Sequence, residues 1–132
     1  MSAMECITLT GISKETIEEL KRGIPRTVEL TSTHNIISLA SAQPDTDIFL
    51  TSIECEDIAT GDPGILVHLL SSTISMKHMV EIGGSHICER EHVTARMKVK
   101  FVSTAKIKIV PCCVLTQARV AKIIRPTGYL AG

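Results

Sequence analysis

The sequence predicts a small mixed α+β domain built around a β-barrel, with one helix near its start. Most of its Val-, Ile- and Leu-rich segments are short and separated by turn residues, as is typical of strands. Only residues 14–22 carry both helix-start and helix-stop signals. At 132 residues the chain can bury one core but is too short for two ordinary domains. We therefore expect residues 1–132 to form a single domain.

The expected helix follows an opening strand over residues 4–9. Ser13 is a good N-cap, and Ile12 and Ile17 have the spacing of a hydrophobic staple around it. Gly23 can adopt the left-handed conformation that ends a helix, and Pro25 cannot continue one. These signals predict a helix over residues 14–22.

The rest of the chain is predicted to be mostly extended. Residues 72–82 are ambiguous, because Ile74, Met76, Val80 and Ile82 suit a strand whereas Met76, Met79 and Val80 also suit one face of a helix; we favour a strand. His68 lies within a nearly continuous apolar run and is predicted to be a hydrogen-bonded strand histidine. An acidic loop with at most one helical turn is expected over residues 54–64. The further strands are expected at residues 26–31, 34–42, 47–53, 65–71, 72–82, 93–101, 106–109 and 115–124.

A basic strand face is the most informative feature for function. Between Val93 and Phe101 the odd positions are mainly apolar, and the even positions carry Arg96, Lys98 and Lys100. The same pattern resumes at Lys106 and Lys108, which predicts a second strand and, if the two strands pair, a basic patch. The plain alternative is a solvated outer face that prevents edge aggregation. On the functional interpretation, Arg96, Lys98 and Lys100 contact phosphates.

The charge is distributed unevenly although the net charge is zero. Residues 1–66 hold four Lys and Arg against eleven Asp and Glu, a net of −7, and residues 67–132 hold ten against three, a net of +7. A cationic surface on such a chain indicates an anionic partner. Only Phe49, Phe101 and Tyr129 are aromatic, which argues against recognition of RNA by stacking on an aromatic platform.

The remaining composition indicates a cytoplasmic protein without a cofactor. No apolar run is long enough to cross a membrane, and the N-terminus lacks a signal region. Five cysteines without a paired framework are expected to be reduced thiols. His86, Cys88 and His92 could share a strand face as metal ligands, but no fourth ligand is evident, so we expect no metal site.

Two segments resemble the ASCH group of PUA-like barrels: EELKRGIPRTVELTS at residues 18–32 and DIFLTS at residues 47–52. The pattern of that group is a helix, a Gly and then Lys-x-x-Glu-x-Arg on a strand, followed by a strand of the Asp-x-Ile-Phe type. Arg26 stands at the Lys position, Glu29 matches the Glu, and Thr31 replaces the Arg. The whole chain is most similar to a small uncharacterised archaeal family.

The resemblance implies a PUA-like barrel that binds RNA or a nucleotide in a cleft beside the helix, with Arg26 and Glu29 near the ligand. Three positions apart on a strand, these two side chains point to opposite faces, so both reach one cleft only if the strand bends or ends there. Some relatives hydrolyse RNA or modified nucleosides, for which a Lys and a Thr three positions later would be expected. Arginine stays protonated and cannot be the general base for such a nucleophile.

We therefore expect a binding module for RNA or a nucleotide-containing ligand, rather than an enzyme, that uses Arg26, Glu29, Arg96, Lys98 and Lys100. One alternative is a small hydrolase of RNA or modified nucleosides, with Glu29 as general base and Arg26 as phosphate partner. Another is a protein-interaction module whose acidic and basic halves pair with a second copy as a homodimer.

Overall fold

The computed structural model describes residues 3–109 and 120–125. In this part of the chain, two short α-helices and one 3-10 helix accompany six strands. The chain is therefore a mixed α+β protein in which most of the regular structure is sheet. In chain order the elements are β1 (Ala3–Leu9), α1 (Lys14–Leu20), β2 (Arg26–Leu30), α2 (Thr33–Ala40), β3 (Asp47–Leu50), η1 (Cys55–Asp57), β4 (Pro63–Gly83), β5 (His86–Ile109) and β6 (Val120–Ile124).

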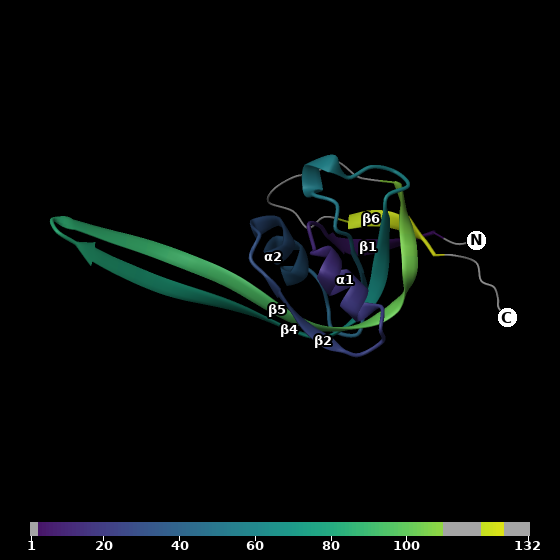
Figure 1. The fold of residues 1–132 in the computed structure, drawn as a ribbon, viewed down its shortest axis with the longest axis horizontal. Coiled ribbons are helices and arrows are strands. Elements are labelled where there is room, and N and C mark those ends of the chain that lie inside the picture. The colour runs from purple at the N-terminus through teal and green to yellow at the C-terminus, as the bar shows by residue number, and fades with distance from the viewer. Residues whose placement is uncertain (1–2, 110–119, 126–132) are drawn as a thin grey trace.

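The strands form one sheet that returns on itself. Their order is β2-β5-β4-β3-β1-β6, and β6 pairs in turn with the end of β5, which closes five of the strands into a ring (Figure 1). β2 lies outside this ring, on the earlier part of β5. Only β1 and β3 pair in parallel; the other described pairs are antiparallel.

The core has two parts, one on each side of the central strands. Strand β3 and the first part of β4 are buried on both faces, because Ile48 and Ile65 belong to one cluster and Phe49 and Leu66 to the other. The first cluster packs α1 and α2 against the outside of the ring. The second cluster fills the inside of the ring and contains Cys6, Phe49, Leu66, Ala105, Ile107 and Ile123.

Helix α1 has the predicted start. The Ser13 hydroxyl accepts a hydrogen bond from the backbone N–H of Thr16 at 3.1 Å, as an N-cap does. Ile12 and Ile17, the predicted staple pair, are both buried. The helix ends at Leu20, two residues earlier than predicted, and Gly23 adopts a positive φ of 87°.

The strand predicted over residues 34–42 is wrong, because this segment is helix α2. The Ser32 hydroxyl caps the helix by accepting from the N–H of Asn35 at 3.3 Å. The buried positions Asn35, Ser38 and Leu39 follow helical spacing, but two of them are polar and so hide the pattern. The β-branched residues Ile36 and Ile37 are only half-buried and misled the prediction. The expectation of a single helix is corrected accordingly.

The other strand predictions are largely confirmed, with two differences. Residues 65–71 and 72–82, expected as two strands, both belong to the continuous strand β4. Likewise, residues 93–101 and 106–109 belong to the single strand β5, so the prediction of two paired basic strands is wrong. The predicted strand over residues 115–124 is confirmed for 120–124; residues 115–119 lie outside the described residues.

Strands β4 and β5 extend well beyond the rest of the sheet as a two-stranded hairpin (Figure 1). From the pair Ile74 and Ala95 to the pair Gly83 and His86, most of each strand pairs only with the other, because β2 reaches no further than Ala95. The turn is completed by Gly84, whose φ is 59°. We call residues 74–95 the arm.

Candidate ligand-binding cavity

A cavity of about 730 Å³ lies beside helix α1. This volume is within the range of about 300–1,000 Å³ that small-molecule sites occupy. The lining residues come from α1, from the segment after β3, from the start of β4, and from the ends of β5 and β6. They are Lys14, Ile17, Glu18, Lys21, Ser52, Pro63, Gly64, Ile65, Thr104, Ala105, Lys106, Ile124 and Arg125.

The apolar part of the lining is fixed by the core. Ile17, Ile65 and Ala105 line the cavity and are buried in the protein. At Gly64 an added Cβ would collide with the Leu50 carbonyl oxygen and the Phe49 ring. Glycine at this position therefore allows β4 to approach β3 closely where the cavity begins.

The polar part of the lining is mainly cationic. Four lining residues, Lys14, Lys21, Lys106 and Arg125, carry positive charge, and Glu18 is the acidic one. Glu18 is paired with Lys21, with an Oε1 to Nζ distance of 3.2 Å. Among the residues that the structure describes, Lys14, Lys106 and Arg125 have no carboxylate within ion-pair distance. The cavity thus combines an apolar floor with unpaired positive charge, which suits an anion that has an apolar part.

An irregularity in β5 directs Lys106 toward this cavity. Val67 pairs with Phe101 but Leu66 pairs with Ser103, so Val102 is an extra residue, as in a β-bulge. The odd-numbered residues change sides there: Val99 belongs to the cluster under the helices, whereas Ile107 belongs to the cluster inside the ring. The even-numbered residues therefore also change sides. Before the bulge they point away from the helices, and after it they point toward them, which is why Lys106 faces α1.

The predicted cations before the bulge lie on the other face of the sheet. Arg96, Lys98 and Lys100 are exposed and form one row along β5, directed away from the cluster under the helices. In the register of the sheet, Lys98 lies opposite Thr27 and Lys100 opposite His68. The sequence prediction therefore located a real basic row, but Lys106 is not part of it.

The structure does not bring Arg26 and Glu29 together. Arg26 contacts the Glu19 carboxylate of α1, and Glu29 accepts from the Arg96 Nε at 3.3 Å. Three positions apart on β2, the two side chains leave opposite faces of the strand. Both ion pairs are largely exposed, and such pairs contribute only about 0–1 kcal/mol to stability. Their assignment to ligand recognition stays a prediction.

A smaller cavity of about 370 Å³ lies near the starts of α1 and α2. Its lining includes Glu29, Glu54 and Glu56, which make it unsuitable for a phosphate. Beside it, Asn35 joins α2 to the end of β1: its Oδ1 accepts from the Thr10 N–H at 2.9 Å, and its Nδ2 donates to the Thr10 carbonyl at 2.8 Å. We assign this region a structural role.

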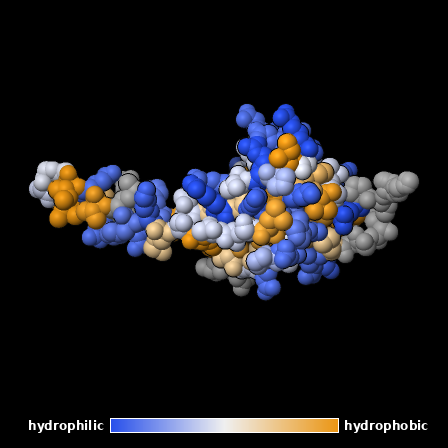
Figure 2. All heavy atoms as spheres, turned by 90° about the horizontal axis from the view of Figure 1, so that it is seen from below, coloured by the Kyte–Doolittle hydropathy of each residue, from blue (hydrophilic) through white to orange (hydrophobic). Residues whose placement is uncertain are grey.

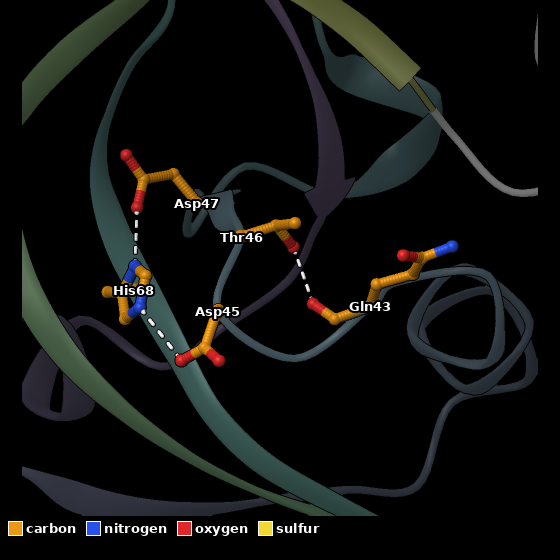
Figure 3. A network of polar contacts seen from close by, with 5 residues as sticks. All are labelled: Gln43, Asp45, Thr46, Asp47 and His68. Atoms are coloured by element: carbon orange, nitrogen blue, oxygen red, sulfur yellow. Dashed lines mark hydrogen bonds and ion pairs between the residues drawn. The ribbon is translucent and has the colours of Figure 1, made fainter.

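His68 is the strand histidine that the sequence predicts, held between two aspartates (Figure 3). Its Nδ1 lies 3.0 Å from Asp47 Oδ1, and its Nε2 lies 3.5 Å from Asp45 Oδ1. The hydrogen bond to Asp47 is the main cause that raises the His68 pKa above its ordinary value of 6.5. In the same turn, Thr46 Oγ1 donates to the Gln43 carbonyl at 2.6 Å. The network fixes the turn before β3 against β4.

The cysteine and histidine candidates show no metal centre in the described part of the chain. No three His, Cys, Asp or Glu side chains come together as ligands in residues 3–109 and 120–125. The His86 side chain lies outside what the structure describes, so the absence of a metal at His86, Cys88 and His92 stays an expectation. Cys88 is exposed, whereas burial raises the pKa of Cys6 to about 11. Cys112 and Cys113 lie outside the described residues.

The helices in the described part of the chain are too short and too polar to cross a membrane. Comparison with the curated proteins and with the solved structures gives no match. One family model does match, over residues 4–121, which include every element described above except the end of β6 and the first residue of β1. The chain therefore belongs to the family described as "Protein of unknown function (DUF473)".

Proposed function

We propose that this protein is a binding module for a nucleotide-containing ligand, and that the ligand occupies the cavity beside α1. The observation that carries the proposal is the set of unpaired cations, Lys14, Lys106 and Arg125, around an apolar floor. A nucleotide has the matching chemistry, since its phosphate is anionic and its base presents apolar faces.

The proposed division of roles follows the lining. The ammonium groups of Lys14 and Lys106 and the guanidinium of Arg125 hold the phosphate through charge-assisted hydrogen bonds. Ile17 and Ile65 pack against the base or the sugar. Glu18 does not repel the phosphate strongly, because Lys21 already balances its charge.

RNA is the polymeric form of this ligand that we favour. The row of Arg96, Lys98 and Lys100 would give it a second, electrostatic contact. Same-face side chains repeat about every 6.6 Å along a strand, which is close to the spacing of phosphates in an extended nucleic-acid backbone. In this proposal Arg26 and Glu29 are secondary contacts. A phosphate could replace Glu19 beside Arg26 at little energetic cost, because that ion pair is largely exposed.

The proposal includes a PUA-like architecture and a cytoplasmic location. The closed ring of strands with α1 and α2 packed outside it supports the first. The absence of a membrane-crossing helix in the described residues is compatible with the second.

The salt dependence of RNA binding tests the electrostatic part of the proposal. For single-stranded RNA, the logarithm of the affinity falls with the logarithm of the salt concentration by about 0.7 per phosphate contact. Replacing both Lys98 and Lys100 by Gln should therefore reduce the slope by about 1.4. Arg22→Gln is the matched control, because Arg22 is exposed and outside both the cavity lining and the basic row. RNA binding that is insensitive to salt would overturn the proposal for RNA.

A further inference from the structure

The two faces of the arm differ in charge. Cross-strand partners share a face, and successive pairs alternate between the two faces. The face that continues the core carries both Glu89 and Glu91 and no Lys or Arg. On the opposite face, the pairs nearest the body contain no Asp or Glu. The arm therefore presents its acidic and its basic side chains mainly to different sides.

The basic row of the body continues along this second face of the arm. Strand β5 alternates without interruption from His92 to Lys100, so its even-numbered residues all lie on one side. We call the surface that they form with their partners on β4 the cationic ladder. Its five pairs are His68 with Lys100, Ser71 with Lys98, Thr73 with Arg96, Ser75 with Thr94, and Lys77 with His92.

Much of the positive charge on the cationic ladder is free to bind an anion. Within the part of the chain that the structure describes, Lys77, Lys98 and Lys100 have no carboxylate within ion-pair distance. All three residues are exposed. Glu81 lies on the same face nearer the turn, so the cationic ladder ends at Lys77 and His92. Figure 2 shows hydrophilic side chains on the arm between its apolar end and the body.

The cationic ladder is too long for a mononucleotide. From Lys100 to His92 it covers eight residue steps of about 3.3 Å each, or about 26 Å. None of its residues lines the cavity beside α1. A ligand that contacts it from end to end must therefore be a polymer with repeated anionic groups.

We propose that the cationic ladder binds double-helical RNA, with the arm lying along the minor groove. This inference rests on the proposed binding of RNA. It adds that the RNA is a duplex and that the arm contacts it.

The side chains of the cationic ladder favour a duplex over a single strand. Proteins that recognise single-stranded RNA usually stack its unpaired bases on aromatic side chains. The five pairs of the cationic ladder contain no Phe, Tyr or Trp. A duplex needs no such platform, because its bases are already stacked on one another. Its phosphates and sugars remain accessible to Lys, Ser and Thr side chains.

The hydroxyl groups of the cationic ladder favour RNA over DNA. Ser71, Thr73 and Ser75 are exposed beside the cations, and each hydroxyl can both donate and accept a hydrogen bond. The minor groove of A-form RNA is wide and shallow and displays 2′-hydroxyls, which also donate and accept. A two-stranded ribbon can lie against such a groove. A DNA duplex lacks these 2′-hydroxyl partners.

A pair of neighbouring substitutions tests the contribution of the arm. The affinity for a short, blunt RNA duplex is measured by fluorescence anisotropy at physiological salt. Ser75→Glu should weaken binding about tenfold or more, because the new carboxylate faces the phosphates. Met76→Glu is the matched control, because it adds the same side chain one residue away on the opposite face, and it should leave binding nearly unchanged.

The salt dependence counts the phosphate contact of the arm. Each such contact on a duplex contributes about 0.9 to the slope of log affinity against log salt, so Lys77→Gln should reduce the slope by about that amount. The double variant Thr73→Val and Ser75→Ala tests the hydroxyl contacts. It should weaken RNA binding about two- to tenfold and reduce the preference for RNA over a DNA duplex of the same sequence.

Three results would overturn the inference. They are equal effects of Ser75→Glu and Met76→Glu, equal affinity for the RNA duplex and its separated strand, and equal affinity for the RNA and DNA duplexes. Binding of AMP distinguishes this inference from the proposed function, because the cavity is separate and none of these variants should change it. A wild-type protein that binds AMP but no RNA duplex would overturn the duplex site alone. A protein that binds neither AMP nor RNA would overturn the proposed function as well.

Discussion

Removing the Asn35 side-chain amide should destabilise the protein strongly, because this group joins α2 to the end of β1. Asn35 is 6% exposed, and its amide satisfies both the N–H and the carbonyl of Thr10, which is also buried. Asn35→Leu keeps a side chain of similar size but leaves both backbone groups without partners. Each unpaired buried group costs about 1–3 kcal/mol, so we expect a loss of about 2–6 kcal/mol in the free energy of unfolding.

Urea denaturation followed by circular dichroism measures this loss. With a slope of about 2 kcal/mol per molar urea, the midpoint should fall by about 1–3 M. Thr33→Leu is the matched control, since Thr33 is exposed on the same helix and should change stability by about 0.5 kcal/mol or less. If Asn35→Leu stayed within that margin with an unchanged slope, the assigned role of the amide would be refuted.

In Asn35→Asp the loss of stability should depend on pH. The carboxylate can still accept from the Thr10 N–H, but when ionised it cannot donate to the Thr10 carbonyl. Burial beside that carbonyl should raise its folded-state pKa above the unfolded value of about 3.9. Relative to the wild type, the variant should therefore keep nearly all of its stability below about pH 3.9, the unfolded-state pKa, and lose it as the pH rises through the folded-state pKa. A difference that stays constant with pH would contradict this.

Three further predictions concern other parts of the fold. Gly64→Ala should destabilise the protein by about 1–3 kcal/mol in urea denaturation, because the added methyl group has no space; an unchanged midpoint would show that the strands can separate there. An NMR titration should give His68 a pKa above 6.5 that falls in Asp47→Asn, and its contribution to stability should be present at low pH and be lost as the pH rises through that pKa. At pH 8, iodoacetamide should modify Cys88 well before Cys6, because the Cys6 pKa is about 11; equal rates by peptide mass spectrometry would contradict its burial.

Local signals in the sequence predicted the fold where they agreed with packing. The cap at Ser13 and the staple of Ile12 and Ile17 located α1 because these residues act within one turn. Helix α2 was missed because its buried face includes Asn35, whose partner Thr10 is 25 residues away in the sequence. No local pattern reveals such a distant partner, although the cap at Ser32 was available as a signal.

The site was predictable only in part, for a geometric reason. The alternation of β5 correctly identified an exposed cationic row at Arg96, Lys98 and Lys100. The bulge at Val102 leaves the alternation in the sequence intact while it moves Lys106 to the side of α1. Lys14 and Arg125 reach the same cavity from opposite ends of the chain, which only the folded structure shows.

The most direct test of the account is the affinity for a mononucleotide, measured by titration calorimetry with AMP. Lys106→Glu reverses a charge in the cavity lining, and Lys98→Glu makes the same change on the opposite face of the same strand. A charge-assisted contact to a phosphate contributes about 1.5–3 kcal/mol, so Lys106→Glu should weaken AMP binding at least tenfold, whereas Lys98→Glu should leave it nearly unchanged. Binding that is unaffected by Lys106→Glu, or weakened equally by both variants, would contradict the assignment of the cavity as the ligand site.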